Sequence, residues 1–195
     1  MITAVIALAL QAAPAPAPPA PPDPCQVDTR AMLALGMDAF DQDMTGGWRA
    51  VSHRPGCDAR AAGLIRDYRT FLEQRLPILY WHEAQLRAAL GETEVAIVLM
   101  ERSRRRGDEN GWNAYVDASI AFLRGDRPAL TAARARLAGL PRPADFEEQT
   151  LPSGYRTRWP PNLDVVDGLI RCFGRPYRNA YAPECRAAEA ANERR

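Results

Sequence analysis

Two stretches of this chain resemble each other at a separation of 34 residues, and no other feature constrains the fold as much. The aligned pairs are Trp81 with Tyr115, Ala84 with Ala118, and Gly91 with Gly125. In each stretch an apolar segment precedes the glycine, and a segment rich in Ala and Leu follows it. A lone helix pair cannot bury its apolar side, whereas stacked pairs share one core. The period therefore predicts stacked pairs of antiparallel helices.

Apolar residues recur at helical spacing along most of the chain, and the alternation typical of strands is almost absent. Proline, glycine and capping residues mark where the helices begin and end. We expect helices over residues 28–40, 48–53, 58–76, 77–90, 93–105, 111–124, 128–140, 162–173 and 176–181. The predicted fold is all-α, a short stack of antiparallel helix pairs with capping helices at each end.

The repeated units resemble tetratricopeptide repeats, a family of helical-repeat proteins. Trp81, Ala84, Gly91 and Ala96 match the family pattern in the first unit. The matches in the second unit are Tyr115, Ala118, Ser119, Phe122, Gly125 and Ala129. The likeness covers about residues 77–141, a degenerate earlier copy begins at Trp48, and Gln85 and Ala88 depart from the pattern. The resemblance implies a scaffold that binds a protein or peptide, although a shared fold alone is weak support for a function.

The same resemblance implies a concave binding face on the first helix of each unit. The candidate binding residues are Leu79, His82, Leu86, Val116, Ile120 and Leu123, with Ala89, Leu90, Asn113 and Arg124 beside them. Because most of these side chains are apolar, something must cover the face. Two alternatives remain for what covers it: a partner, or terminal helices of the chain itself. The stripe formed by Leu163, Val166, Ile170 and Phe173 would suit the second.

The N-terminal residues have the pattern of an export signal followed by a spacer. Residues 2–10 are apolar, and the run is shorter than the roughly 20 residues needed to span a bilayer. Residues 14–24 contain seven prolines and favour an extended spacer over a packed element. We expect a signal peptide at 1–13, a linker at 14–24, a helical domain at 25–185 and a frayed tail at 186–195. The mature chain would have no membrane span and would be periplasmic or secreted.

The four cysteines, Cys25, Cys57, Cys172 and Cys185, agree with export. No pair has the C-x-x-C spacing of a zinc ribbon or a thioredoxin-like redox site. An even number in an exported chain indicates two disulfides, and three pairings are possible. Because local loops cost least chain entropy to close, we predict Cys25 with Cys57 and Cys172 with Cys185.

The charged residues support neither a nucleic-acid partner nor a metal site. The 25 basic and 24 acidic residues give a net charge of +1, without the cationic surplus that phosphate binding needs. The segment from Asp41 to Gly46 matches half of a calcium-binding EF-hand loop, but Ser52 stands where the bidentate glutamate belongs. We expect no metal and no cofactor.

No catalytic motif frames a serine, a cysteine or either histidine. The favoured function is therefore binding of a protein or peptide. The alternative is a small secreted hydrolase whose active site lies in the loop at 142–161, where Asp145, Glu147 and Glu148 could carry out acid–base chemistry. A third possibility is a structural or inhibitory protein without a small-molecule ligand.

Overall fold

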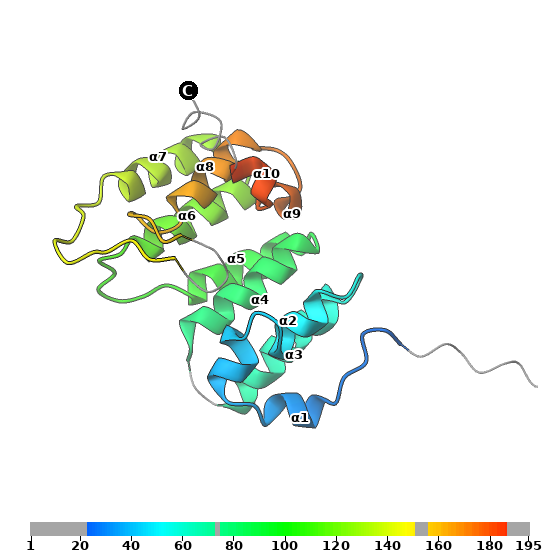
Figure 1. Ribbon diagram of the computed structural model, residues 1–195. Coiled ribbons are helices and arrows are strands. Elements are labelled where there is room, and N and C mark those ends of the chain that lie inside the picture. The colour runs from blue at the N-terminus through cyan, green and yellow to red at the C-terminus, as the bar shows by residue number, and fades with distance from the viewer. Residues whose placement is uncertain (1–22, 73–74, 151–155, 187–195) are drawn as a thin grey trace, which may run out of the picture.

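The computed structural model describes residues 23–72, 75–150 and 156–186, and helices dominate these ranges (Figure 1). The predicted all-α fold is confirmed. The predicted signal peptide, nearly all of the linker and residues 187–195 of the tail lie outside the described residues.

In chain order the elements are α1 (Thr29–Leu33), the π-helical turn η1 (Asp38–Gln42), α2 (Gly47–Ser52), α3 (Asp58–Phe71), α4 (Pro77–Ala89), α5 (Thr93–Arg102), α6 (Trp112–Leu123), α7 (Arg127–Ala138), α8 (Leu163–Arg171), α9 (Tyr177–Ala180) and α10 (Pro183–Arg186).

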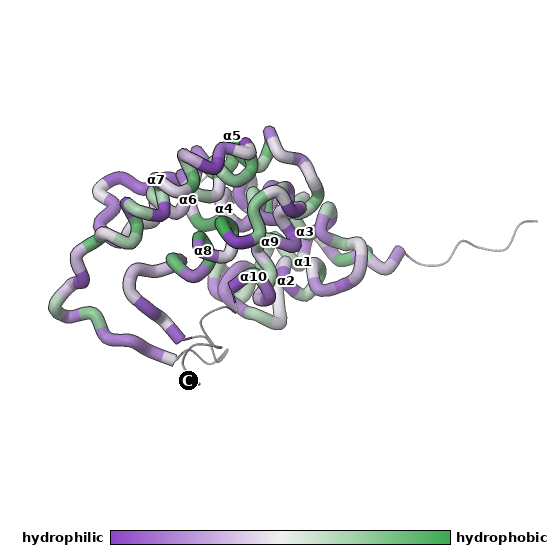
Figure 2. The backbone as a smooth tube through the Cα atoms, turned by 90° about the horizontal axis from the view of Figure 1, so that it is seen from above, coloured by the Kyte–Doolittle hydropathy of each residue, from purple (hydrophilic) through white to green (hydrophobic). Residues whose placement is uncertain are grey.

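The helices are amphipathic, and the tube in Figure 2 changes between apolar and polar colours along them. None of the helices in the described ranges is long and apolar enough to cross a membrane.

The elements α1, η1, α2 and α3 enclose the first of two hydrophobic cores. Within it the rings of Phe40 and Tyr68 stack with their centroids 3.7 Å apart. The Tyr68 hydroxyl donates a hydrogen bond of 2.7 Å to the Leu35 carbonyl. The predicted disulfide between Cys25 and Cys57 is confirmed, and it ties the segment before α1 to the start of α3. The bridge stabilises the part of the chain that forms the smaller of the two cores, because it limits the conformations of that part in the unfolded state.

The helices α4 and α5 form one antiparallel pair, and α6 and α7 form the next. Gly91 and Gly125 end the first helix of each pair with φ angles of 80° and 69°, a conformation that suits glycine. Between the pairs the Trp81 ring lies 5.1 Å from Trp112 and 4.7 Å from Tyr115, measured between centroids. The aromatic residues that align at the repeat period thus meet in the second core.

The C-terminal helices cover one side of the second pair. Helix α8 packs on α6 and α7, and its Val165, Val166 and Leu169 are buried in the second core. Outside that core Arg134 makes two hydrogen bonds, of 2.8 and 3.2 Å, to the Asp167 carboxylate. The predicted disulfide between Cys172 and Cys185 is also confirmed, and it fastens α10 to the end of α8.

The helices differ from the prediction in several places, among them the end of α5, which lies at Arg102 and not at residue 105. The helix expected at 28–40 is divided into α1 and η1, with a turn and bend at residues 34 and 35 between them. The helix expected to run to residue 76 ends at Phe71. The short helix α10 was not among the expected helices; it begins at Pro183, a residue that is well tolerated in the first turn of a helix.

Candidate functional site

The face predicted from the repeat resemblance is largely buried. Leu79 and Val116 have no exposed surface, and Ile120 is 3% exposed. His82, Leu86 and Leu123 are partly buried. The structure does not bring the six residues together around one open groove.

Five of these six positions belong to two different hydrophobic cores, and His82 lies in neither. Leu79 and Leu86 on α4 pack with the N-terminal core. Val116, Ile120 and Leu123 on α6 pack with the second core. The chain itself supplies the cover, as in the second of the two alternatives, because α3 packs on α4 and α8 packs on α6. Of the predicted stripe, Val166 is buried and the other three members pack partly buried against the core.

His82 has a specific role in the described structure, because it bonds to a buried carboxylate. Asp41 in η1 has no exposed surface, and its Oδ1 lies 2.7 Å from His82 Nδ1. The same oxygen accepts a hydrogen bond of 2.9 Å from Trp48 Nε1. The other oxygen accepts one of 2.5 Å from Gln42. Both carboxylate oxygens therefore have donors, as a buried charge requires.

The backbone permits this cluster only because residue 47 is glycine. Gly47 has a φ of 50°, and a Cβ there would lie 2.0 Å from the Phe40 carbonyl oxygen. The close approach of α2 to η1 places Trp48 and Arg49 beside Asp41. The Arg49 guanidinium donates a hydrogen bond of 2.5 Å to the Asp41 carbonyl and lies 4.2 Å from the Trp48 ring centroid.

The environment of Asp41 keeps its carboxyl group ionised. Burial by itself raises the pKa, but the hydrogen bonds from His82 and Trp48 and the positive charges of His82 and Arg49 outweigh it. The net result is a pKa below the ordinary value of 3.8. The ionised Asp41 accepts a hydrogen bond from His82 Nδ1–H and so fixes the orientation of that ring.

Catalytic triads contain a histidine that is oriented by an aspartate, together with a nucleophile. The described residues place no nucleophile beside His82. No serine, threonine or cysteine in the described ranges is hydrogen-bonded to His82, and none of the clefts described below is lined by it. The cluster joins η1, α2 and α4, and its evident effect is to fasten the N-terminal unit to the repeat-like helices.

The half EF-hand is not arranged around a metal. Asp41 points into its own buried cluster, whereas Asp43 accepts hydrogen bonds from the Thr45 amide and hydroxyl at 2.8 and 2.9 Å. Within the described ranges no group of three or more His, Cys, Asp or Glu side chains could hold a metal ion. The two aspartates shape the turn between η1 and α2.

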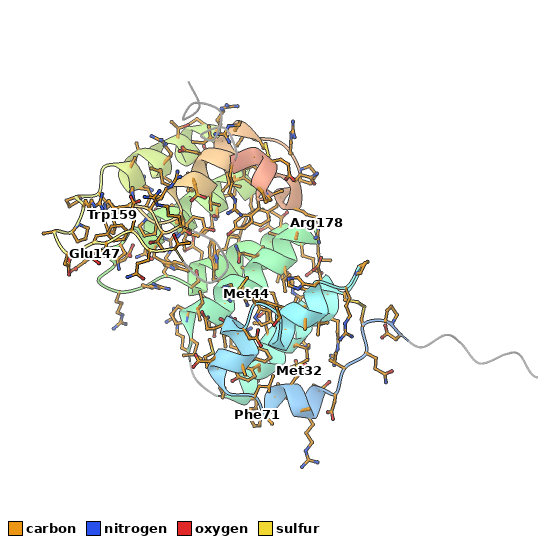
Figure 3. All side chains as sticks on the ribbon, in the orientation of Figure 1. Met32, Met44, Phe71, Glu147, Trp159 and Arg178 are labelled. Atoms are coloured by element: carbon orange, nitrogen blue, oxygen red, sulfur yellow. A yellow bond between two sulfur atoms is a disulfide. The ribbon has the colours of Figure 1, made fainter. Side chains whose placement is uncertain are left out.

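An open site lies between the α5–α6 turn and the loop that follows α7; we call it the loop cleft. It consists of two adjoining hollows of about 520 and 280 Å³. Both hollows are lined by Asn110, Phe146, Trp159, Pro161 and Asn162. Figure 3 labels two side chains of this loop, Trp159 and Glu147, on the same side of the molecule.

The loop wall of the cleft is held by bonds to the helical body and within the loop. Trp159 Nε1 donates a hydrogen bond of 3.2 Å to the Leu140 carbonyl, just beyond α7. The Thr157 amide donates to the Gln149 carbonyl at 2.7 Å, which draws the two arms of the loop together. The Phe146 and Trp159 rings pack with centroids 5.2 Å apart. The aromatic part of the cleft therefore has a defined position.

The opposite wall rests on the start of α6. The Asp108 carboxylate accepts hydrogen bonds from the amides of Trp112 and Asn113 at 3.0 and 2.7 Å and so caps the helix. Trp112 Nε1 donates to the Ser103 carbonyl at 2.8 Å, and the Arg105 guanidinium lies 4.1 Å from the Trp112 ring centroid. A loop wall and a helix terminus thus enclose a cleft lined by aromatic, amide and charged groups.

The acids expected in this loop are placed differently from one another. Asp145 and Glu147 line the larger hollow. Glu148 is not among the lining residues, and it makes an ion pair of 3.0 Å with Arg156. The aromatic members of the site were missed in the sequence. Phe146 and Trp159 could have been noticed as large aromatic residues inside a proline-containing, otherwise polar loop.

No protein-family model, curated protein or solved structure matches this chain. The functional assignment therefore depends on the geometry of the chain's own residues.

Two further clefts lie on the helical body. One, of about 490 Å³, is lined by Ala89, Leu90 and Leu123 at the turn end of the predicted face. The other, of about 430 Å³, lies beside an ion-pair network in which Asp117 binds Arg104 and Arg136, each at 2.7 Å. Four of its charged groups, Glu101, Arg104, Asp117 and Arg136, pair with one another, and the loop cleft is the better candidate because it combines aromatic and amide groups.

Proposed function

We propose that this chain is an extracytoplasmic binding protein that holds a short peptide segment in the loop cleft. The helical body acts as the scaffold and the loop after α7 carries the recognition surface. Loops placed on a rigid scaffold are common binding sites because their side chains vary without cost to the core. The proposal keeps the binding function implied by the repeat resemblance but assigns it to a different surface.

The observation that carries the proposal is the composition of the cleft. Phe146 and Trp159 offer aromatic contact area, while Asn110, Gln149 and Asn162 offer amide groups that can bond to a peptide backbone. Ligand sites usually combine an apolar, aromatic lining with a few polar groups, in volumes of roughly 300–1,000 Å³. The larger hollow, at about 520 Å³, lies in that range.

The location part of the proposal is supported by the two disulfides. Such bridges persist in oxidising compartments and are rare where thiols are kept reduced. The apolar N-terminal run and the proline-rich spacer read from the sequence support export as well. A periplasmic or secreted chain would meet its ligand outside the cytoplasm.

The second candidate function, hydrolysis by carboxylates of this loop, shares the same cleft. Asp145 and Glu147 both line it, so a bound peptide would lie near two acids. Binding is better supported because it needs only the aromatic and amide groups, whereas hydrolysis also requires acids paired in defined geometry. One assay separates the two: peptides recovered from the cleft are intact if the chain binds and shortened if it cleaves.

A displayed library of random heptapeptides tests the proposal. The full oxidised chain is immobilised and the captured peptides are compared with those captured by Trp159→Ala. We expect sequences enriched by the wild type and lost in the variant. Trp159→Phe, which keeps a ring but loses the bond to Leu140, should retain most of the capture. Equal capture by wild type and Trp159→Ala would overturn the proposal, as would binding of oligosaccharides with no peptide enrichment.

A further inference from the structure

We propose that the loop cleft selects peptides that carry a cationic side chain, arginine or lysine. The cation would lie against the Phe146 and Trp159 rings, within reach of the Asp145 and Glu147 carboxylates. This inference depends on the proposed peptide-binding function and adds the chemistry of the ligand. Four observations support it.

The first is the state of the acidic side chains around the cleft. Glu148 is neutralised by Arg156, and Asp108 is occupied in capping α6. Asp145 and Glu147 line the larger hollow, and neither has an ion pair or a side-chain hydrogen bond among the described residues. These two carboxylates are therefore able to pair with charges brought by a ligand.

The second observation is the balance of charge along the lining of the larger hollow. Its described charged residues are Asp145, Glu147 and Arg158, two acids and one base. Arg105 lines the smaller hollow, where its guanidinium already lies against the Trp112 ring. Over both hollows the two acids are balanced by two arginines, but the larger hollow alone holds two acids and one base, and this local excess of negative charge favours a cationic partner over an acidic one.

The third observation is the aromatic pair beside the carboxylates. The Phe146 and Trp159 ring planes are inclined at 59° with their centroids 5.2 Å apart. The faces of such rings attract cations, and guanidinium groups also stack on them. A cation placed there would have ring faces and carboxylates as neighbours.

The fourth observation is an intramolecular precedent at the same ring. The Arg142 guanidinium lies 5.3 Å from the Phe146 ring centroid and donates a hydrogen bond of 3.4 Å to the Phe146 carbonyl. Arg142 is exposed, so this contact with Phe146 is formed at the protein surface. A guanidinium from a peptide would repeat at the cleft a contact that the chain makes with its own side chain.

The test uses a fluorescent heptapeptide, Gly-Ala-Arg-Ala-Arg-Ala-Gly, and a twin in which neutral citrulline replaces both arginines. We expect the wild type to bind the arginine peptide at least about 10-fold more tightly, a difference of about 1.4 kcal/mol. The double variant Asp145→Asn with Glu147→Gln should remove that preference, so that it binds the two peptides with equal affinity. The control Glu148→Gln removes one negative charge from the same loop outside the cleft and should keep the preference.

Each outcome bears on one proposal. Equal affinity of the wild type for both peptides would overturn the cation inference while peptide binding stands. Equal loss in the double variant and in Glu148→Gln would overturn it as well, because the effect would then be general electrostatics. If the random library yields no peptide that depends on Trp159, the proposed function itself fails.

Discussion

The apolar face on α4 and α6 differs from the loop cleft in how far its side chains are buried. Both regions carry side chains that could contact a ligand. Leu79 and Val116 on the helices are wholly buried, and each packs into a core closed by other helices of the chain. Phe146 and Trp159 in the loop pack on one another, yet they still line an open hollow.

The difference follows from the backbone of each region. A helix satisfies its own backbone hydrogen bonds, so its apolar stripe can be buried without polar cost. The loop after α7 has few internal backbone bonds and must stay at the surface, where its side chains remain available. In this molecule the most apolar face therefore stabilises the fold, and the mixed, partly exposed surface is the one suited to recognition.

The largest effect should come from placing a charge on the helical face. Val116→Asp would bury an unpaired carboxylate, and we expect it to lower the free energy of unfolding by at least about 3 kcal/mol. Leu90→Asp at the turn end of the same face, where the side chain is 38% exposed, should change it by less than about 0.5 kcal/mol. Urea denaturation followed by circular dichroism measures both. A folded Val116→Asp with wild-type stability would show that the face is open.

The buried Asp41 cluster should give the next largest effect. Asp41→Ala leaves His82 Nδ1 and Trp48 Nε1 without their partner, and we expect a loss of about 3–5 kcal/mol. Asp38→Ala removes an exposed carboxylate from the same π-helical turn and is the matched control, with little change expected. Similar unfolding midpoints for the two variants would contradict the role assigned to Asp41.

Asp41 should also make the stability of the chain depend on pH. Its pKa in the folded state lies below the ordinary value of 3.8, so its contribution is fully present above that value. The contribution is lost as the pH falls through the lower folded pKa. Urea midpoints measured in acid should therefore fall more steeply for the wild type than for Asp41→Asn. Parallel curves for the two proteins would show that Asp41 does not titrate in this way.

The loss of stability on removing each disulfide should increase with the length of chain that the disulfide encloses. The Cys25–Cys57 bridge spans 32 residues and the Cys172–Cys185 bridge spans 13. The chain-entropy relation then gives losses of about 4 and about 3 kcal/mol when each pair is replaced by serine. Thermal unfolding of the two double variants measures the order. A larger loss for the shorter bridge would indicate that α10 contributes more to the second core than its covalent link.

The smallest effect on stability is expected in the loop cleft. Phe146→Ala removes a partly exposed ring and should lower the free energy of unfolding by no more than about 1 kcal/mol, yet it should abolish peptide capture. Phe71→Ala, which removes a 63% exposed ring from the end of α3, should leave capture intact. Denaturation and library capture on the same preparations separate the two properties.

The sequence predicts the helical body well because helix periods and stop signals are local. The spacing from Ala61 to Tyr68, the glycines at 91 and 125 and Pro77 each mark an element that the structure contains. The disulfide pairs also follow from local chain entropy. The repeat resemblance stays a prediction, because helix pairing alone does not identify the type of repeat.

The sites could not be predicted to the same extent, because they depend on contacts between distant segments. Periodicity identifies Val116 as apolar, but only packing shows that α8 lies over α6. Asp41 and His82 are 41 positions apart, and they meet only where the folded chain brings η1 against α4. In the loop, the sequence pointed to Asp145 and Glu147 but not to the ring pair beside them, whose packing depends on how the loop folds back.

The central claim is that the ligand binds at the loop cleft and not along the helical face, and mapping of amide chemical shifts tests it most directly. A library-selected peptide is titrated into the ¹⁵N-labelled, oxidised chain. The account predicts shift changes concentrated at residues 105–112, 142–150 and 156–162, with α4 and the body of α6 unchanged. Changes centred on residues 79–90 and 113–124, with the loop unaffected, would contradict it.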